Sequence, residues 1–162
     1  MARQVDMPVA VMRHDAGANI NAAASDNLVD WTVEVLKDEN FYSHSTVTNP
    51  SRITVARAGR YLIRTILSFN TLVANYTGAA KVRTNGSTVD PARGKAGVAG
   101  GFGGFQESSM VLPVILDLSA DDYVEVLVDR INATGSVTLT GSESAISIVA
   151  LFTDATVAPW AP

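Results

Sequence analysis

Residues Arg52–Asn70 read RITVARAGRYLIRTILSFN, and this stretch decides the fold. After the break at Ala58-Gly59, apolar or β-branched side chains recur at every second position, which is the period of a β-strand. The face that they form consists of Tyr61, Ile63, Thr65, Leu67 and Phe69. We therefore expect one long strand that turns this face toward the core of the protein.

The opposite face of the same strand is not plainly polar. Leu62 and Ile66 lie there beside Arg64 and Ser68. A strand with apolar side chains on both faces needs a core on one side and a second layer or subunit on the other. The stretch therefore predicts a small all-β protein that assembles with further copies of itself.

Composition narrows the class of protein. The 162 residues fit one domain, and 17% are charged, against about 25% in typical soluble domains. The net charge of −4 and the lack of a basic stripe argue against nucleic acid as the main partner. The absence of cysteine excludes disulfides, thiolate metal sites and cysteine nucleophiles. No bound cofactor is expected.

The N-terminal sequence, MARQVDMPVAVMRHDAG, contains no apolar core of signal-peptide length. No segment of the chain approaches the roughly 18 apolar residues of a membrane-spanning helix. We therefore expect a chain made in the cytoplasm without a signal peptide and without a membrane partner.

Three parts are expected along the chain: an N-terminal arm at residues 1–8, a β domain at residues 9–153 and a C-terminal tail at residues 154–162. Besides the stretch above, strands are expected from Val9 onward and at Leu28–Leu36, Phe41–Val47, Ala79–Thr84, Ser109–Leu118, Tyr123–Ile131, Gly135–Leu139 and Ala145–Phe152. Eight to ten short strands without a substantial helix predict a β-sandwich or barrel, and the long connections favour a jelly roll.

The sequence also predicts one strand face, one hairpin turn and one long loop. Within Leu28–Leu36, alternation puts Trp31, Val33 and Val35 on one side of a single strand. The Asn85-Gly86 pair predicts a two-residue hairpin turn, because both residues tolerate positive φ. The segment Pro91–Gly104, PARGKAGVAGGFGG, holds six of the twelve glycines and is expected to be a long loop.

Catalytic and phosphate-binding patterns are weak. His14 and His44 are far apart and lack metal-ligand spacing, so each is expected to be a surface or packed histidine. The sequence also lacks a Gly-x-Ser-x-Gly nucleophile motif. Gly101–Phe105 is glycine-rich, but no Lys-Ser/Thr pair follows it. We expect a flap or contact loop there, with Phe102 and Phe105 as anchors.

Four aspartates, Asp117, Asp121, Asp122 and Asp129, could contribute to a calcium site. Their spacing matches no calcium-binding loop, and aspartate is a common turn residue. We expect turns rather than a metal site.

Several short motifs, taken in order, resemble a known family. They are Phe41-Tyr42, Ile53-Thr54-Val55, Ala58–Ile63, Val82–Gly86, Leu116-Asp117-Leu118, Asp122–Val126 and Ser144–Phe152. Together they are similar to the tumour-necrosis-factor-like jelly roll, which is shared with the globular head of complement's first-component recognition subunit. The resemblance covers about residues 28–153, and it departs from the family at Asp121-Asp122, where Gly-Asp is common.

The resemblance implies a homotrimer in which the inner sheets of three copies pack around a threefold axis. Residues expected in the core or the trimer interface are Tyr61, Ile63, Tyr123, Val126, Ile148, Leu151 and Phe152. Similar domains also occur in tailed-phage virions, as capsid decoration proteins and as fibre heads. An unsignalled, cysteine-free chain of low charge fits that setting.

Three hypotheses about function follow. The first is a non-enzymatic trimer that binds the major capsid protein lattice on the exterior of a phage virion and stabilises it. Its candidate capsid contacts are Val5 and Met7 in the arm and Trp160 in the tail. The second is a fibre head that binds a host glycan or receptor through loop residues such as Phe102 and Phe105. The third, an enzyme, lacks an acid, base and nucleophile set.

Overall fold

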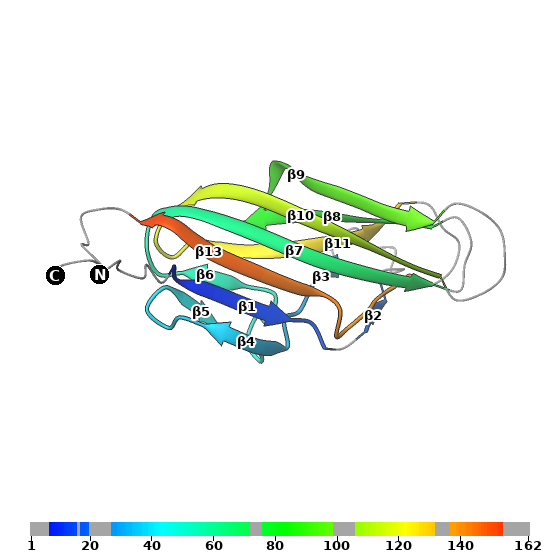
Figure 1. The fold of residues 1–162 in the computed structure, drawn as a ribbon, viewed down its shortest axis with the longest axis horizontal. Coiled ribbons are helices and arrows are strands. Elements are labelled where there is room, and N and C mark those ends of the chain that lie inside the picture. The colour runs from blue at the N-terminus through cyan, green and yellow to red at the C-terminus, as the bar shows by residue number, and fades with distance from the viewer. Residues whose placement is uncertain are drawn as a thin grey trace, which may run out of the picture.

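The computed structural model describes residues 7–15, 17–19, 27–71, 76–98, 106–131 and 137–153. This part of the chain forms thirteen β-strands in two antiparallel sheets that pack face to face, and it contains no helix (Figure 1). Accordingly, no helix of the described residues is long and apolar enough to cross a membrane.

The first sheet is built around β7, which joins strands from three parts of the chain. Its members are β1 (Val9–Arg13), β2 (Ala18–Asn19), β4 (Val33–Lys37), β7 (Gly59–Thr71), β10 (Gln106–Leu118), β12 (Val137–Leu139) and β13 (Ala145–Thr153). β10 pairs with β7 over its whole length, while β13 and then β12 pair with the other edge of β7. β1 follows β13, and β4 forms the far edge.

The second sheet is built around β11 and β8. Its members are β3 (Asn27–Leu28), β5 (Tyr42–His44), β6 (Ile53–Val55), β8 (Tyr76–Thr84), β9 (Ser87–Val98) and β11 (Tyr123–Arg130). The strand order is β5-β6-β11-β8-β9, and β3 also pairs with β11. Consecutive strands often belong to different sheets, so the chain crosses repeatedly between the two layers.

The core lies between the sheets, and the alternation in β7 agrees with the sequence pattern. Its inward side chains Tyr61, Ile63, Leu67 and Phe69 are all fully buried, and so is Thr65. Other large, fully buried side chains of the core are Trp31, in the segment between β3 and β4, and Tyr42, Met12, Ile53 and Leu139. The prediction of an all-β sandwich with this face of β7 toward its core is confirmed.

The predicted hairpin turn is also confirmed. Asn85 and Gly86 have φ values of 50° and 78°, and they join β8 to β9. Asp121 adopts φ of 70° in the turn before β11. Asp122 connects these two turns: its carboxylate accepts hydrogen bonds from Asn85 Nδ2 at 2.6 Å and from the Ser119 N–H at 2.7 Å.

The expectation of a long loop at Pro91–Gly104 is wrong over its first half. β9 continues through Val98 and pairs with β8 as far as Tyr76. Gly94 fits this strand because a Cβ there would lie only 3.3 Å from Met110 Sδ of β10. Glycine therefore permits close approach of the two sheets instead of breaking the strand. Residues 99–104 lie outside the described residues.

The single strand expected at Leu28–Leu36 is also wrong. The backbone pairs with the second sheet at β3, crosses over at residues 29–32 and joins the first sheet at β4. Consequently Trp31 is fully buried, whereas Val35 is 59% exposed, and the two do not share a side. The expected strand Phe41–Val47 is shorter, because β5 ends at His44.

Replacing Asp122 with alanine tests the hydrogen bonds by which its carboxylate links the Asn85-Gly86 turn to the turn before β11. Loss of the charged acceptor should lower the free energy of unfolding by about 2 kcal/mol, measured by urea denaturation. Asp15→Ala is the matched control, since the Asp15 carboxylate makes only an exposed 3.4 Å ion pair with Arg13. That change should stay within about 0.5 kcal/mol. Equal effects of the two variants would contradict the role of Asp122.

Candidate functional site

The outer face of the first sheet, which points away from the core, is largely apolar. Cross-strand pairing aligns its side chains in rows across β10, β7, β13, β1 and β4. One row contains Ile115, Leu62, Val149 and Val9; the next contains Pro113, Arg64, Ser147, Val11 and Leu36; a third contains Val111, Ile66 and Ala145 and ends in Arg13 of β1. We call these three rows the apolar face.

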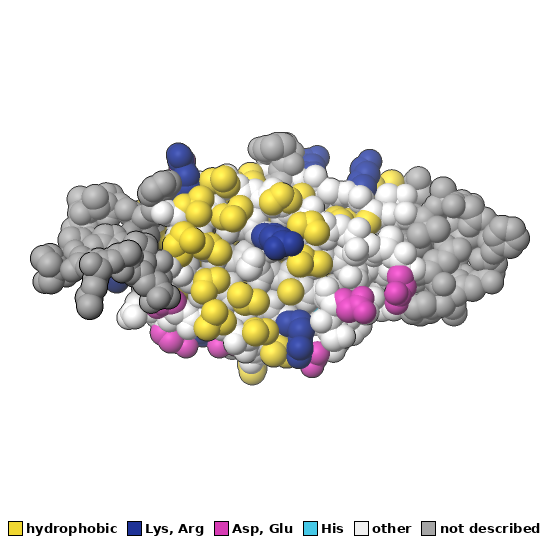
Figure 2. Space-filling model, viewed as in Figure 1, with side chains coloured by type: hydrophobic (Ala, Val, Ile, Leu, Met, Phe, Trp, Pro, Cys, Tyr) yellow, Lys and Arg dark blue, Asp and Glu magenta, His cyan; other side chains and the backbone are white. Residues whose placement is uncertain are grey.

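Side chains of the apolar face are accessible in the single chain. Ile115 is 57% exposed, Leu36 is 53% exposed and Val111 is 52% exposed, while Leu62, Ile66 and Val149 are half-buried. Figure 2 shows hydrophobic side chains gathered over this sheet, with one cationic group in their midst and a second at their margin. Monomeric soluble proteins rarely leave a contiguous apolar patch of this kind uncovered.

Arg64 lies in the middle row and is exposed. Among the described residues, no acidic side chain forms an ion pair with its guanidinium. At one end of the sheet, by contrast, Arg60 donates two hydrogen bonds to Asp117, at 2.8 and 2.9 Å. These hydrogen bonds hold the pKa of Asp117 below its ordinary value. The apolar face thus has one unpaired cation at its centre.

Carboxylates lie toward the opposite end of the same sheet. Glu107 and Glu143, with Ser68, Ser108 and Ser109, line a small hollow of about 170 Å³. Both glutamates are exposed. The sheet therefore presents a cation at the centre of its apolar rows and acidic groups at one margin.

The residues expected in the core or interface fall into different places. Tyr61, Ile63, Val126 and Ile148 are buried in the core. Leu151 is half-buried in β13. The outer face of the second sheet carries Tyr123, whose ring lies 4.3 Å below the Arg52 guanidinium carbon.

Of the candidate partner contacts, Met7 is 55% exposed. Val5, Phe102, Phe105 and Trp160 lie outside the described residues, as does the side chain of Phe152. The expected interface residues do not include Val111, Pro113 or Ile115 of β10. Their alternation with Met110, Leu112 and Val114 in the sequence is the signal that could have identified them.

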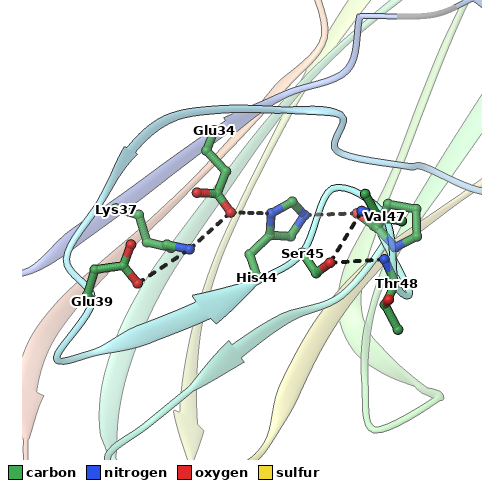
Figure 3. A network of polar contacts seen from close by, with 8 residues as sticks. Glu34, Lys37, Glu39, His44, Ser45, Val47 and Thr48 are labelled. Carbon is green, nitrogen blue, oxygen red and sulfur yellow. Dashed lines mark hydrogen bonds and ion pairs between the residues drawn. The ribbon is translucent and has the colours of Figure 1, made fainter.

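A polar network holds the β4–β5 region together (Figure 3). Lys37 Nζ donates to Glu34 at 3.0 Å and lies 3.5 Å from Glu39. The other partner of Glu34 is His44, whose Nδ1 is 3.0 Å from the carboxylate and whose Nε2 is 3.1 Å from the Pro50 carbonyl oxygen. Burial acts to raise the pKa of Glu34, but the hydrogen bonds from Lys37 and His44 outweigh it and leave the pKa lowered.

This network contains a serine, a histidine and a glutamate, but it lacks the contact that nucleophilic catalysis needs. Ser45 Oγ accepts hydrogen bonds from the N–H groups of Val47 and Thr48, at 3.3 and 2.9 Å. Both ring nitrogens of His44 face other acceptors, so neither activates the serine. These hydrogen bonds stabilise the loop that follows β5.

The other histidine is packed as well, as expected. His14 is 3% exposed, and its Nδ1 lies 2.6 Å from the Asp30 carbonyl oxygen.

Three of the four candidate calcium ligands have partners of their own, and the fourth, Asp121, lies in the turn before β11. Asp117 pairs with Arg60, Asp129 pairs with Lys81 at 2.8 Å, and Asp122 holds the two turns described above. Within the described ranges, no three His, Asp or Glu side chains converge as a metal site would require. The pairs and turn contacts give Asp117, Asp122 and Asp129 structural roles.

Comparison with known proteins identifies the fold and nothing finer. No family model matches the chain, and no curated protein matches it. Among solved structures, the crystal structure of murine APRIL at pH 8.0 is 16% identical, with a TM-score of 0.59. The match covers 90% of this chain and 100% of that one. The chain therefore has a tumour-necrosis-factor-like jelly-roll fold.

Glu34→Gln tests the network in Figure 3 through pH. A carboxylate whose pKa is lowered by folding adds stability above its unfolded pKa of about 4.3, and this is lost as pH falls through the folded pKa. The variant should be less stable than the wild type by about 1 kcal/mol at pH 6. The difference should shrink below pH 4 in urea titrations. A difference that is constant from pH 6 to pH 3 would contradict the charged interaction.

Proposed function

We propose that this chain is a non-enzymatic structural protein that forms a homotrimer through the apolar face and decorates the exterior of a phage capsid. The observation that carries the proposal is the exposed apolar face, with Ile115, Val111 and Leu36 each more than half exposed. Within one chain, the second sheet covers only the inner face of β7 and leaves the outer face without a covering layer. Further copies of the chain supply the layer on the outer side.

Burial of the apolar face can release more free energy than association costs. A stable interface buries about 1,000 Å² or more in total. At about 25 cal/mol per Å² of apolar surface, this corresponds to a gross gain on the order of 25 kcal/mol. Association costs about 4–15 kcal/mol, together with further side-chain ordering. A flat apolar sheet that closes against its copies therefore supports a permanent assembly.

Charge placement favours a ring over a twofold dimer. In a dimer centred on the apolar face, Arg64 of one copy would lie near Arg64 of the other, and the two unpaired cations would repel. In a cyclic assembly different parts of the face meet. Arg64 of one copy can then approach the acidic margin at Glu107 and Glu143 of the next, which satisfies its charge within the interface.

Placement on a capsid is supported by the resemblance to phage virion domains, by the low charge and by the lack of an assembled catalytic set among the described residues. The chain would be made in the host cytoplasm and bind the major capsid protein lattice. The arm and the tail are the proposed capsid contacts, and they leave the apolar face for trimer formation.

A charge in the apolar face should dissociate the trimer. Light scattering across a dilution series should give three times 17.1 kDa for the wild type and a single chain's mass for Ile115→Glu. Val47→Glu is the matched control, because Val47 is 86% exposed on the loop between β5 and β6 of the second sheet. It should remain trimeric. A wild-type monomer or dimer would overturn the assembly.

Capsid binding tests the location separately. Chains lacking residues 1–8, residues 154–162 or both are mixed with undecorated capsids, and occupancy is measured after sedimentation. At least one deletion should reduce occupancy more than tenfold while the trimer mass per chain is retained. Undiminished occupancy without both segments would contradict their role. A trimer that binds host cells but not capsids would favour the fibre-head function.

A further inference from the structure

The turn between β8 and β9 contains a dipeptide that can modify itself. The backbone N–H of the residue after an asparagine can attack the side-chain amide carbon, and a following glycine has no Cβ to obstruct that approach. In the whole sequence, Asn85 is the one asparagine that precedes a glycine. Its side chain is exposed, so water has access to the amide. The Asn85-Gly86 pair is therefore a candidate site of spontaneous deamidation.

The reaction needs only this dipeptide and water. The Gly86 nitrogen bonds to Asn85 Cγ, the bond between Cγ and Nδ2 breaks, and Nδ2 leaves as ammonia with the proton that the Gly86 nitrogen gives up. The product is a cyclic imide. Water then opens the imide at one of its carbonyls and gives either aspartate or isoaspartate, in which the backbone runs through the side-chain carbon. Each product carries a carboxylate in place of the neutral amide.

Hydrogen bonds to the start of β11 hold Asn85 away from this reaction. Asn85 Nδ2 donates to Asp122 Oδ1 at 2.6 Å, and Asn85 Oδ1 accepts from the Tyr123 N–H at 3.0 Å. The Asn85 N–H donates to the Tyr123 carbonyl oxygen at 3.1 Å. Gly86 is held as well, because its carbonyl oxygen accepts a hydrogen bond from Arg83 Nε at 2.9 Å. Both atoms of the amide are thus engaged, and Cγ has to be released before the Gly86 nitrogen can attack it.

We propose that Asn85 is a deamidation site that the fold protects through Asp122 and Tyr123, and that its reaction breaks the link between the two turns. The product lacks the N–H group that donates to Asp122. Its new carboxylate faces the Asp122 carboxylate at the position of a 2.6 Å hydrogen bond. Like charges at such a separation repel each other. The modification therefore turns a stabilising contact between the turns into a repulsive one.

Incubation at mildly alkaline pH followed by peptide mass spectrometry measures the reaction at Asn85. The folded wild type should react about tenfold or more slowly than the wild type in guanidinium chloride, because a hydrogen bond to a charged group favours the bound amide to about that extent. Asn49 is the internal control, since Pro50 has no N–H to attack it. Equal rates at Asn85 in the folded and the unfolded wild type would overturn the protection.

Two variants separate local release of the amide from global unfolding. Asp122→Ala removes the charged acceptor and should speed the reaction in the folded protein about tenfold. Ile148→Ala is the control, because it truncates a fully buried side chain of the first sheet and destabilises the fold at least as much. It should react at the wild-type rate. Equal acceleration by both variants would show release by global unfolding and would overturn the role of Asp122.

Asn85→Asp reproduces the aspartate product. It should lower the thermal midpoint at neutral pH, and the loss should shrink in acid, where protonation removes the repulsion between the two carboxylates. Asn49→Asp is the matched control: Asn49 is also exposed, has φ of 51° and forms no hydrogen bond to a carboxylate among the described residues. It should leave the midpoint nearly unchanged.

A wild-type midpoint in Asn85→Asp, or an equal loss in Asn49→Asp, would overturn the repulsion at Asp122. None of these measurements depends on trimer formation or capsid binding. Failure here therefore leaves the proposed assembly intact, and failure of the trimer leaves these tests valid.

Discussion

The antiparallel ladder between β7 and β10 is the constraint on which the rest of the structure depends. Thirteen residues of β7 pair in one unbroken register with β10, from Gly59 opposite Leu118 to Thr71 opposite Gln106. Because side chains alternate across a strand, a slip of one residue would move Tyr61 and Ile63 to the outside and Arg64 into the core. This register therefore fixes the core and the apolar face together. It also sets the positions of β13 and β12, which pair with the other edge of β7.

The two outer faces of the sandwich carry different chemistry. On the first sheet, apolar side chains surround one unpaired arginine, an arrangement suited to burial against another protein surface. On the second sheet, charged pairs dominate, including Lys81 with Asp129 and Arg52 with Glu125 at 2.9 Å. Glu125 is only 1% exposed, so its pairing with Arg52 compensates for removal of the carboxylate from water. The fold thus separates a largely apolar outer face from a charged one.

Among the described residues no catalytic set is assembled, and the proposed function rests on assembly instead. The proposed trimer relies on area and shape, where many half-exposed side chains each contribute a little.

The sequence by itself determined the all-β class, the inward face of β7, the Asn85-Gly86 turn and the two-sided apolar character of the central strand. These are local properties, since strand period and turn chemistry are set by neighbouring residues. Only the tertiary structure decided that Pro91–Val98 is a strand, because glycine there is explained by the approach of Met110 from the other sheet. It also decided where the chain crosses between sheets at residues 29–32. The rows of the apolar face combine residues from separate strands, and their register is fixed by pairing across the sheet, which no local pattern encodes.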